Sequence, residues 1–265
     1  MLKISDLTCG YGTKIVLNGI NLEIGKGEFA GIIGPNGSGK TTLLKAVTRL
    51  IKPYKGKIYL EDKELHSIDH KEIAQKIAVV SQNLPVISMT VKEYVFLGRT
   101  PHYKNLQFFE TENDVEVAEH AMIMTDIIKL QDSYMSEISG GEMQLALIAR
   151  ALAQEPWMLL LDEPTAHLDI THQVNILDLI RKLNKEYGLT VIIVLHDLNL
   201  ASEYCDRLIL MDKGRIKKTG TPEEVLNYND IEEVYKTLVV VERNPISQKP
   251  FVLIVPEEVR EKCRR

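Results

Sequence analysis

The sequence has few of the features that mark several large protein classes. Its 3 cysteines, Cys9, Cys205 and Cys263, are far apart and form no Cys-x-x-Cys pair, which favours free thiols in a reducing compartment over disulfides or zinc. No apolar run approaches the roughly 18 residues of a spanning helix, and the N-terminus has no signal-peptide pattern. We therefore expect the chain itself neither to enter nor to cross a membrane. A net charge of −5, without a basic stripe, argues against a nucleic-acid-binding protein.

The composition, 45% hydrophobic and 26% charged over 265 residues, is sufficient for one large α/β domain or two subdomains. Segments that alternate apolar and polar residues, typical of half-exposed antiparallel strands, lie at 2–7, 20–24 and 57–60. Continuous apolar runs, typical of buried parallel strands, lie at 29–33, 77–80, 158–161 and 191–195.

The segment between residues 90 and 153 has a helical pattern instead, which indicates a helical insertion in the α/β core. Its apolar stripe has helical spacing and predicts a core face, formed by Val117, Ala121, Met124 and Ile128. Further along, Thr221-Pro222-Glu223-Glu224 places a hydroxyl cap, a proline and a glutamate in register for a helix start.

A glycine-rich loop follows the apolar run 29–33 and precedes a helical segment at 42–50. The loop consists of Gly34, Pro35, Asn36, Gly37, Ser38, Gly39, Lys40, Thr41 and Thr42. Glycines let the backbone N–H groups turn inward at a helix N-terminus, where they can bind an anionic phosphate. Lys40 would neutralise β- and γ-phosphates, and the Thr41 hydroxyl would bind Mg²⁺. A glycine-rich turn without a ligand is the alternative, but the flanking strand and helix favour a phosphate loop.

Two adjacent carboxylates, Asp162 and Glu163, follow the apolar run 158–161. This places them at the strand edge where open α/β sheets bind ligands. Because successive side chains of a strand point in different directions, we expect different tasks for the two acids. Asp162 would hold Mg²⁺ and Glu163 would polarise the water that attacks the γ-phosphate. A pair of solvated acids is the alternative, which the phosphate loop makes the weaker interpretation.

A second potential anion site is Ser139-Gly140-Gly141, at the start of a helix-favouring segment. The serine hydroxyl, the bare backbone donors and the positive end of the helix dipole all suit a phosphate. Alone, this segment would be interpreted as an ordinary helix cap.

Together these motifs resemble the ATP-binding subunits of ABC transporters, over nearly the whole chain. The resemblance implies ATP and Mg²⁺ as cofactors and an ATPase activity coupled to transport. It implies that Tyr11 stacks on adenine, that Gln82 senses Mg²⁺ and couples to the membrane partner, and that His196 contacts the γ-phosphate. Glu163, His196 and Gln82 would then be catalytic, and Thr41, Gln82 and Asp162 would hold the metal.

The resemblance also implies the architecture and the partners. The expected fold is an α/β P-loop NTPase with a mostly parallel core sheet, an N-terminal antiparallel β subdomain and an inserted helical subdomain. The expected parts are a core at 1–89 and 154–226, a helical subdomain at 90–153 and a C-terminal extension at 227–265. A second copy would form an ATP-dependent head-to-tail dimer in which Ser139, Gly140 and Gly141 bind the partner's nucleotide. The segment Leu168-Asp169 would communicate between the two sites.

Within the family, the segments 97–102, 162–173 and 194–201 resemble ATPases of importers for ferric siderophores, haem and cobalamin. The chain would then be a peripheral subunit at the cytoplasmic face of the membrane, bound to permease subunits and served indirectly by a substrate-binding protein. Docking is expected over Gln82 to Arg99, whose apolar residues include Pro85, Val86, Ile87 and Met89. Leu145 and Ile138 depart from the family pattern, which usually has arginine and leucine there. A soluble ABC-type ATPase, such as one for iron–sulphur cluster assembly, is the alternative.

Overall fold

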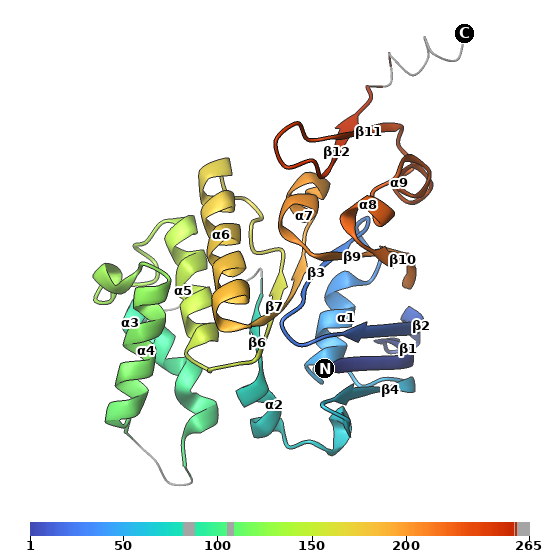
Figure 1. Cartoon of the computed structure of the whole chain (residues 1–265). Coiled ribbons are helices and arrows are strands. Elements are labelled where there is room, and N and C mark those ends of the chain that lie inside the picture. Colours follow the sequence, from blue (N-terminus) through green and yellow to red (C-terminus); the bar gives the residue numbers. More distant parts are fainter. Residues whose placement is uncertain (82–87, 105–108, 257, 259–265) are drawn as a thin grey trace. The chain divides into compact units, whose positions relative to one another are not determined.

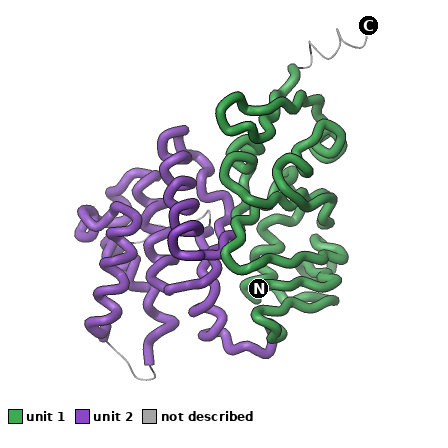
Figure 2. Tube along the Cα trace, in the orientation of Figure 1, with its two compact units in different colours: residues 1–65, 192–265 green, residues 66–191 purple. Residues whose placement is uncertain are grey.

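The computed structural model describes residues 1–81, 88–104, 109–256 and 258. The chain divides into two compact units, which Figure 2 shows in different colours. Unit 1 comprises residues 1–65 and 192–265, and unit 2 comprises residues 66–191. Figure 1 labels the helices and strands.

Unit 1 contains an antiparallel sheet in the strand order β2-β1-β4-β5. Its strands are β1 (Leu2–Tyr11), β2 (Lys14–Ile24), β4 (Lys55–Leu60) and β5 (Lys63–Glu64). Along β1, Leu2, Ile4 and Leu7 are buried while Lys3 is exposed. This alternation buries one face of the sheet, as a half-exposed sheet requires, and confirms the predicted antiparallel strands.

Unit 1 also contains parallel strands. β3 (Phe29–Ile33) pairs in parallel with β9 (Arg207–Asp212), and β10 (Arg215–Gly220) pairs with β9 in antiparallel. β8 (Thr190–Val194), which crosses the unit boundary, follows β3 in the strand order and, like β3, is buried along its whole length. Burial on both faces explains why these strands are continuous apolar runs in the sequence.

Three of the described helices of unit 1, α7, α8 and α9, begin at side-chain caps, including the predicted Thr221–Glu224 capping box, whereas α1 begins at Gly39 without one. The helices are α1 (Lys40–Val47), α7 (Leu198–Tyr204), α8 (Pro222–Val225) and α9 (Tyr228–Tyr235). A hairpin of β11 (Val239–Arg243) and β12 (Pro250–Ile254) packs on α7 and α9.

Unit 2 combines two parallel strands with a group of helices. β6 (Ile77–Val80) pairs with β7 (Met158–Asp162) in parallel, with Ile77 opposite Met158. The helices α3, α4 and α5 pack against one another, which confirms the predicted helical character of residues 90–153. The helical elements are η1 (Leu65–Ser67, which crosses the unit boundary), α2 (His70–Lys76), α3 (Val91–Phe96), η2 (Leu97–His102), α4 (Glu112–Met124), η3 (Ile128–Leu130), α5 (Gly140–Leu152) and α6 (Ile170–Tyr187). In the described part of the chain, no helix is both long and apolar enough to cross a membrane.

The buried face of α4 differs from the predicted one. Only Ala121 of the expected stripe is buried, whereas Val117, Met124 and Ile128 are half-buried. The buried residues of α4 are Asp114, Ala118, Ala121 and Met122. Asp114 turns inward because it pairs with the buried Arg99, so the helix is rotated relative to its most apolar stripe. Val117 and Met124 instead line an open cavity of about 530 Å³ beside Trp157.

Candidate functional site

The phosphate loop of unit 1 connects β3 to α1 through left-handed glycine conformations. Gly34, Gly37 and Gly39 have φ values of 147°, 78° and 105°. Such angles strain any residue with a Cβ atom, so the loop path requires glycine. Lys40 is 5% exposed, and its ammonium group donates to the carbonyl oxygens of Gly34 (2.8 Å) and Pro35 (3.1 Å). The loop therefore curls around a buried cation at the N-terminus of α1.

The loop also has features that fit a bound phosphate. The Ser38 hydroxyl is buried and has no hydrogen-bond partner among the described residues. A Cβ atom added to Gly37 would meet nothing within 4 Å, so the loop is open there. A buried hydroxyl without a partner is costly, and a phosphate oxygen would satisfy it. Of the other predicted loop residues, Asn36 is exposed, Thr41 is half-buried and Thr42 is buried.

The phosphate loop contacts residues far along the chain that no sequence motif predicted. Gly214 donates its backbone N–H to the Ser38 carbonyl at 3.0 Å. A Cβ atom on Gly34 would lie 2.2 Å from the Met211 carbonyl oxygen, so the loop backbone is packed tightly on this neighbour. Tyr235 of α9 has a buried hydroxyl beside the backbone of Gly34, and burial raises the pKa of Tyr235 to about 12. The segment after residue 226 thus contributes to the wall of the phosphate loop.

Tyr11 and His196 are the other predicted site residues of unit 1. Tyr11 ends β1 and is 49% exposed, with the Lys45 ammonium group 5.9 Å from its ring centroid. His196 is exposed just beyond β8. The Leu195 N–H donates to the Ile32 carbonyl at 3.2 Å, so His196 follows the end of a strand adjacent to the one that enters the phosphate loop.

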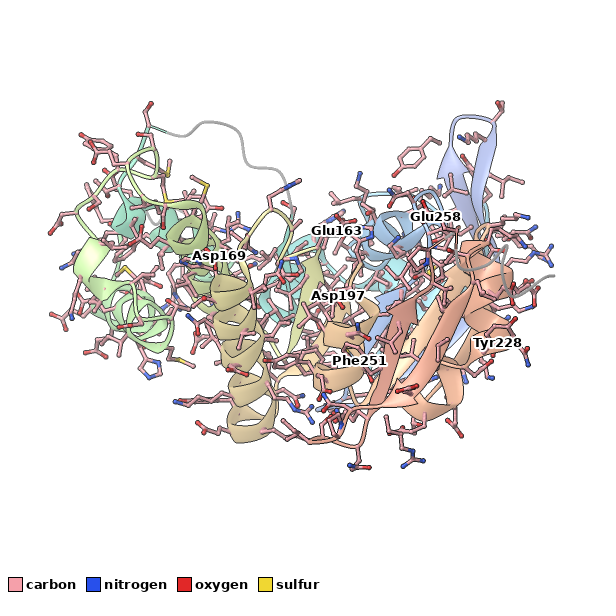
Figure 3. All side chains as sticks on the ribbon, turned by 90° about the horizontal axis from the view of Figure 1, so that it is seen from above. Glu163, Asp169, Asp197, Tyr228, Phe251 and Glu258 are labelled. Atoms are coloured by element: carbon pink, nitrogen blue, oxygen red, sulfur yellow. The ribbon has the colours of Figure 1, made fainter. Side chains whose placement is uncertain are left out.

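The predicted acids lie at the end of β7 in unit 2. Asp162 is the last residue of the strand, and Glu163 follows in a left-handed conformation with φ 55° (Figure 3). The Glu163 carbonyl accepts the Ala166 N–H at 3.1 Å, which closes a turn. Gln173 of α6 donates to the carbonyl oxygens of Thr165 (3.3 Å) and Leu168 (2.9 Å). The segment between β7 and α6 is therefore held in place by hydrogen bonds to its own backbone.

The Ser139 segment forms the N-terminus of α5. The Ser139 hydroxyl donates to the Glu142 carboxylate at 2.7 Å and accepts its N–H at 3.3 Å, and the carboxylate accepts the Ser139 N–H at 2.8 Å. These bonds from Ser139 lower the pKa of Glu142. Ser139 and Gly140 are exposed, so this helix end is accessible to a ligand or a second molecule. Leu145, which departs from the family pattern, is half-buried one turn further along.

Gly141 packs against the start of α6. A Cβ atom on Gly141 would lie 2.2 Å from Cδ2 of His172, so only glycine fits there without a shift. Asp169 caps α6 by accepting the His172 N–H at 3.0 Å, and its other oxygen contacts the His172 Nδ1 at 2.8 Å. The backbone and ring contacts of His172 lower the pKa of Asp169. Within unit 2, Gly141 of the predicted signature segment thus packs on His172, which Asp169 of the predicted communicating segment binds.

The predicted docking surface is only partly described. Gln82, Pro85, Val86 and Ile87 lie outside the described residues. Arg99 was expected at the surface, and this prediction is wrong: its side chain is 2% exposed. The charge is buried because two carboxylates and a backbone carbonyl surround it.

Comparison with known proteins identifies the family. The family model described as "ABC transporter" matches residues 17–166. The chain belongs to the ABC transporter family. The α/β fold and the family predicted from the sequence are therefore confirmed.

The sequence similarity to relatives extends along nearly the whole chain. The ferric enterobactin transport ATP-binding protein FepC of Escherichia coli is 40% identical over 95% of this chain and 93% of its own. The petrobactin import ATP-binding protein FpuC of Bacillus anthracis is 36% identical over 99% of this chain and 95% of its own. YvrA of Bacillus subtilis, an uncharacterised ABC transporter ATP-binding protein, is 41% identical, and the chain spans 58% of its length.

Solved structures agree with the fold. A structure of an inward-facing metal-chelate type ABC transporter has a TM-score of 0.83 and 26% identity, covering 96% of both chains. The ABC transporter cassette MJ0796 in its dimeric form has a TM-score of 0.73 and 33% identity, covering 83% of this chain and 98% of its own.

Proposed function

We propose that this chain is the ATP-hydrolysing subunit of an importer for an iron–siderophore, haem or cobalamin. The observation that carries the ATPase assignment is the glycine loop that holds the buried Lys40 cation between β3 and α1. The names of FepC and FpuC, both siderophore transport proteins, support the cargo class. The structure of a metal-chelate type transporter with a TM-score of 0.83 supports it as well.

Each residue of the loop and of the strand ends has a proposed task. Tyr11 stacks on the adenine ring, and the backbone N–H groups of residues 34–42 bind the phosphates. Lys40 exchanges its loop carbonyls for the β- and γ-phosphate oxygens. Thr41, Gln82 and Asp162 would hold Mg²⁺, which supplies charge neutralisation on the phosphates when bound. Glu163 accepts the proton of the attacking water, and His196 hydrogen-bonds the γ-phosphate.

The exposed Ser139 and Gly140 complete the site of a second copy. The exposed N-terminus of α5, with its hydroxyl cap, is suited to a phosphate, as is the phosphate loop at the N-terminus of α1. In a two-fold dimer, each phosphate loop faces the Ser139 segment of the partner, so that two nucleotides are buried between the same pair of surfaces. The dimeric MJ0796 cassette supports this arrangement. ATP binding closes the dimer, and hydrolysis opens it.

The membrane permease docks on α3 and η2 in unit 2. An open cavity of about 500 Å³, here called the docking groove, lies on these elements. It is lined by Lys92, Glu93, Phe96, Leu97, Thr100, Tyr103, Glu110 and Val115. Leu97 is 47% exposed, and the groove combines apolar side chains with a charged rim, as expected of a protein interface. Through this contact the chain is held at the cytoplasmic face of the membrane as a peripheral subunit.

Glu163→Gln tests the ATPase assignment. The amide cannot accept the proton of water, so the variant should bind ATP, lose turnover and form a stable dimer on size exclusion with MgATP. Lys40→Ala is the matched control, because it should lose nucleotide binding and remain a monomer. Wild-type turnover in Glu163→Gln would contradict the assignment, and co-purification with a soluble scaffold instead of a permease would contradict the transport function.

A further inference from the structure

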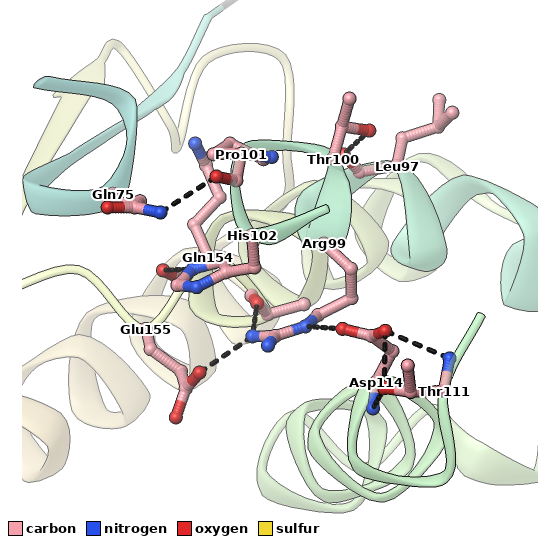
Figure 4. A network of polar contacts seen from close by, with 11 residues as sticks. Gln75, Leu97, Arg99, Thr100, Pro101, His102, Thr111, Asp114, Gln154 and Glu155 are labelled. Carbon is pink, nitrogen blue, oxygen red and sulfur yellow. Dashed lines mark hydrogen bonds and ion pairs between the residues drawn. The ribbon is translucent and has the colours of Figure 1, made fainter. Parts of the chain in front are cut away.

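Arg99 of η2 makes contacts with three residues in two separate segments of unit 2. Its Nε donates to Oδ1 of Asp114 at 3.0 Å, at the start of α4 (Figure 4). Its Nη1 donates to the carbonyl oxygen of Ala153 and to Oε2 of Glu155, both at 2.7 Å, at the end of α5. The guanidinium plane therefore fixes η2 against the ends of two helices.

These contacts fix the position of the guanidinium group more than they add to stability. Removing a charge pair from water costs several kcal/mol, so a buried ion pair often adds little net stability. A guanidinium group fixes geometry instead, because its donors form a planar and rigid fork. Asp114 is fixed in turn, since it accepts bonds from the N–H (3.0 Å) and the hydroxyl (2.7 Å) of Thr111.

Two further hydrogen bonds attach the C-terminal half of η2. Gln75 of α2 donates to the Pro101 carbonyl at 2.8 Å, and the His102 Nε2 contacts the Gln154 carbonyl at 2.9 Å. Gln154 in turn donates to the Ala74 carbonyl at 2.9 Å. η2 is thus attached to the end of α5 both at Arg99 and at His102.

The position of Arg99 connects two proposed functional surfaces. Leu97 and Thr100, on either side of Arg99 in sequence, line the docking groove. The helix that Arg99 holds at its C-terminal end, α5, begins beside Ser139 at the other end. A helix of this length is about 20 Å long and moves as a rigid rod.

We propose that Arg99 is a positioning residue that couples the docking groove to the Ser139 end of α5. A displacement of η2 by the permease is transmitted through the guanidinium to the Ala153 carbonyl and so along α5 to the nucleotide of the partner subunit. By linkage, nucleotide binding at Ser139 displaces η2 in the same way. The proposal rests on the proposed function, and it adds the residue that joins the two surfaces.

Arg99→Lys tests the coupling in the complex of this chain with its permease in liposomes. Lysine keeps the positive charge but cannot donate from one rigid plane to both Asp114 and Ala153. We expect ATP affinity, basal ATPase activity and permease binding to stay unchanged, and the stimulation of ATPase by the permease to fall about tenfold. A purely structural role would lower basal and stimulated activity in parallel.

Arg207→Lys in unit 1 is the matched control. Its guanidinium also donates to a backbone carbonyl (Glu23, 2.9 Å), a carboxylate (Glu28, 3.3 Å) and a hydroxyl (Thr219, 2.8 Å). The stimulation ratio should be that of wild type in this variant. If Arg99→Lys does not fold, the double variant Arg99→Met with Asp114→Asn removes both charges of the Arg99–Asp114 pair and keeps the acceptor for Thr111.

The outcomes separate the inference from the function. A wild-type stimulation ratio in Arg99→Lys or in the double variant would overturn the coupling role, as would a parallel loss of basal activity. Loss of the stimulation ratio alone would support it. If the permease does not stimulate even the wild-type chain, the proposed transport function itself fails.

Discussion

The two glycines of the Ser139 segment should respond differently to the same substitution. A Cβ atom on Gly140 would lie 3.7 Å from Cδ2 of Leu168, an ordinary contact distance. A Cβ atom on Gly141 would lie 2.2 Å from Cδ2 and 2.8 Å from Nε2 of His172. Either the imidazole or the helix must therefore move in Gly141→Ala, whereas Gly140→Ala requires no movement.

The expected magnitudes follow from these distances. Alanine in place of glycine stabilises a helix by up to about 1 kcal/mol, and both variants gain this term. Forcing a methyl group into filled space costs about 1–3 kcal/mol, and only Gly141→Ala carries this cost. Turning the His172 ring away would also break its contact with Asp169, which adds little because that pair is exposed. Gly141→Ala should therefore be less stable than Gly140→Ala by about 1–3 kcal/mol.

Thermal unfolding of the nucleotide-free chain measures the difference. For a chain of this size, each kcal/mol shifts Tm by about 2–4 °C. In a chain that already carries His172→Ala, the further change Gly141→Ala should lower Tm much less than it does in the wild-type chain, because the methyl group then has space. Equal Tm values for Gly140→Ala and Gly141→Ala, or additive effects of Gly141→Ala and His172→Ala, would refute the steric reasoning.

Further predictions concern the buried acid and the shared nucleotide sites. Burial would raise the pKa of Asp114, but bonds from Thr111 and Arg99 outweigh it and lower the pKa from 3.8 to about 2. The stabilisation by ionised Asp114 is complete above the pKa that this residue has in the unfolded chain, and it is lost as the pH falls towards 2. In urea unfolding, the free energy of unfolding of wild type should exceed that of Asp114→Asn by less at pH 3 than at pH 5. Lys40→Ala should abolish ATP binding to its own subunit, whereas Ser139→Ala should impair closure on the partner's nucleotide. Mixed dimers of the two variants should therefore contain two unequal sites, and equivalent sites would contradict the shared-site arrangement.

The sequence predicts those parts of the fold that depend on local patterns. The strand 29–33 has the predicted bounds because both of its faces are buried, which leaves a continuous apolar run. The buried face of α4 was predicted wrongly because the helix buries Asp114, which pairs with Arg99, and leaves the apolar residues Val117 and Met124 half-buried. No local pattern shows that Arg99 finds its partners 15 and 56 residues away in the sequence. Long-range pairing of charges is invisible to periodicity, and so is the support of the phosphate loop by Gly214.

The backbone at Glu163 gives an argument for function that does not depend on motifs. Its φ of 55° lies in the left-handed region, which costs roughly 1–2 kcal/mol for a residue with a Cβ atom and nothing for glycine. On stability alone, glycine would be the better residue at this turn. Residues with a strained backbone conformation are common in active sites, where the strain fixes the direction of a side chain. The turn closed by the Ala166 N–H holds Glu163 in this conformation, which supports the proposed role of its carboxylate.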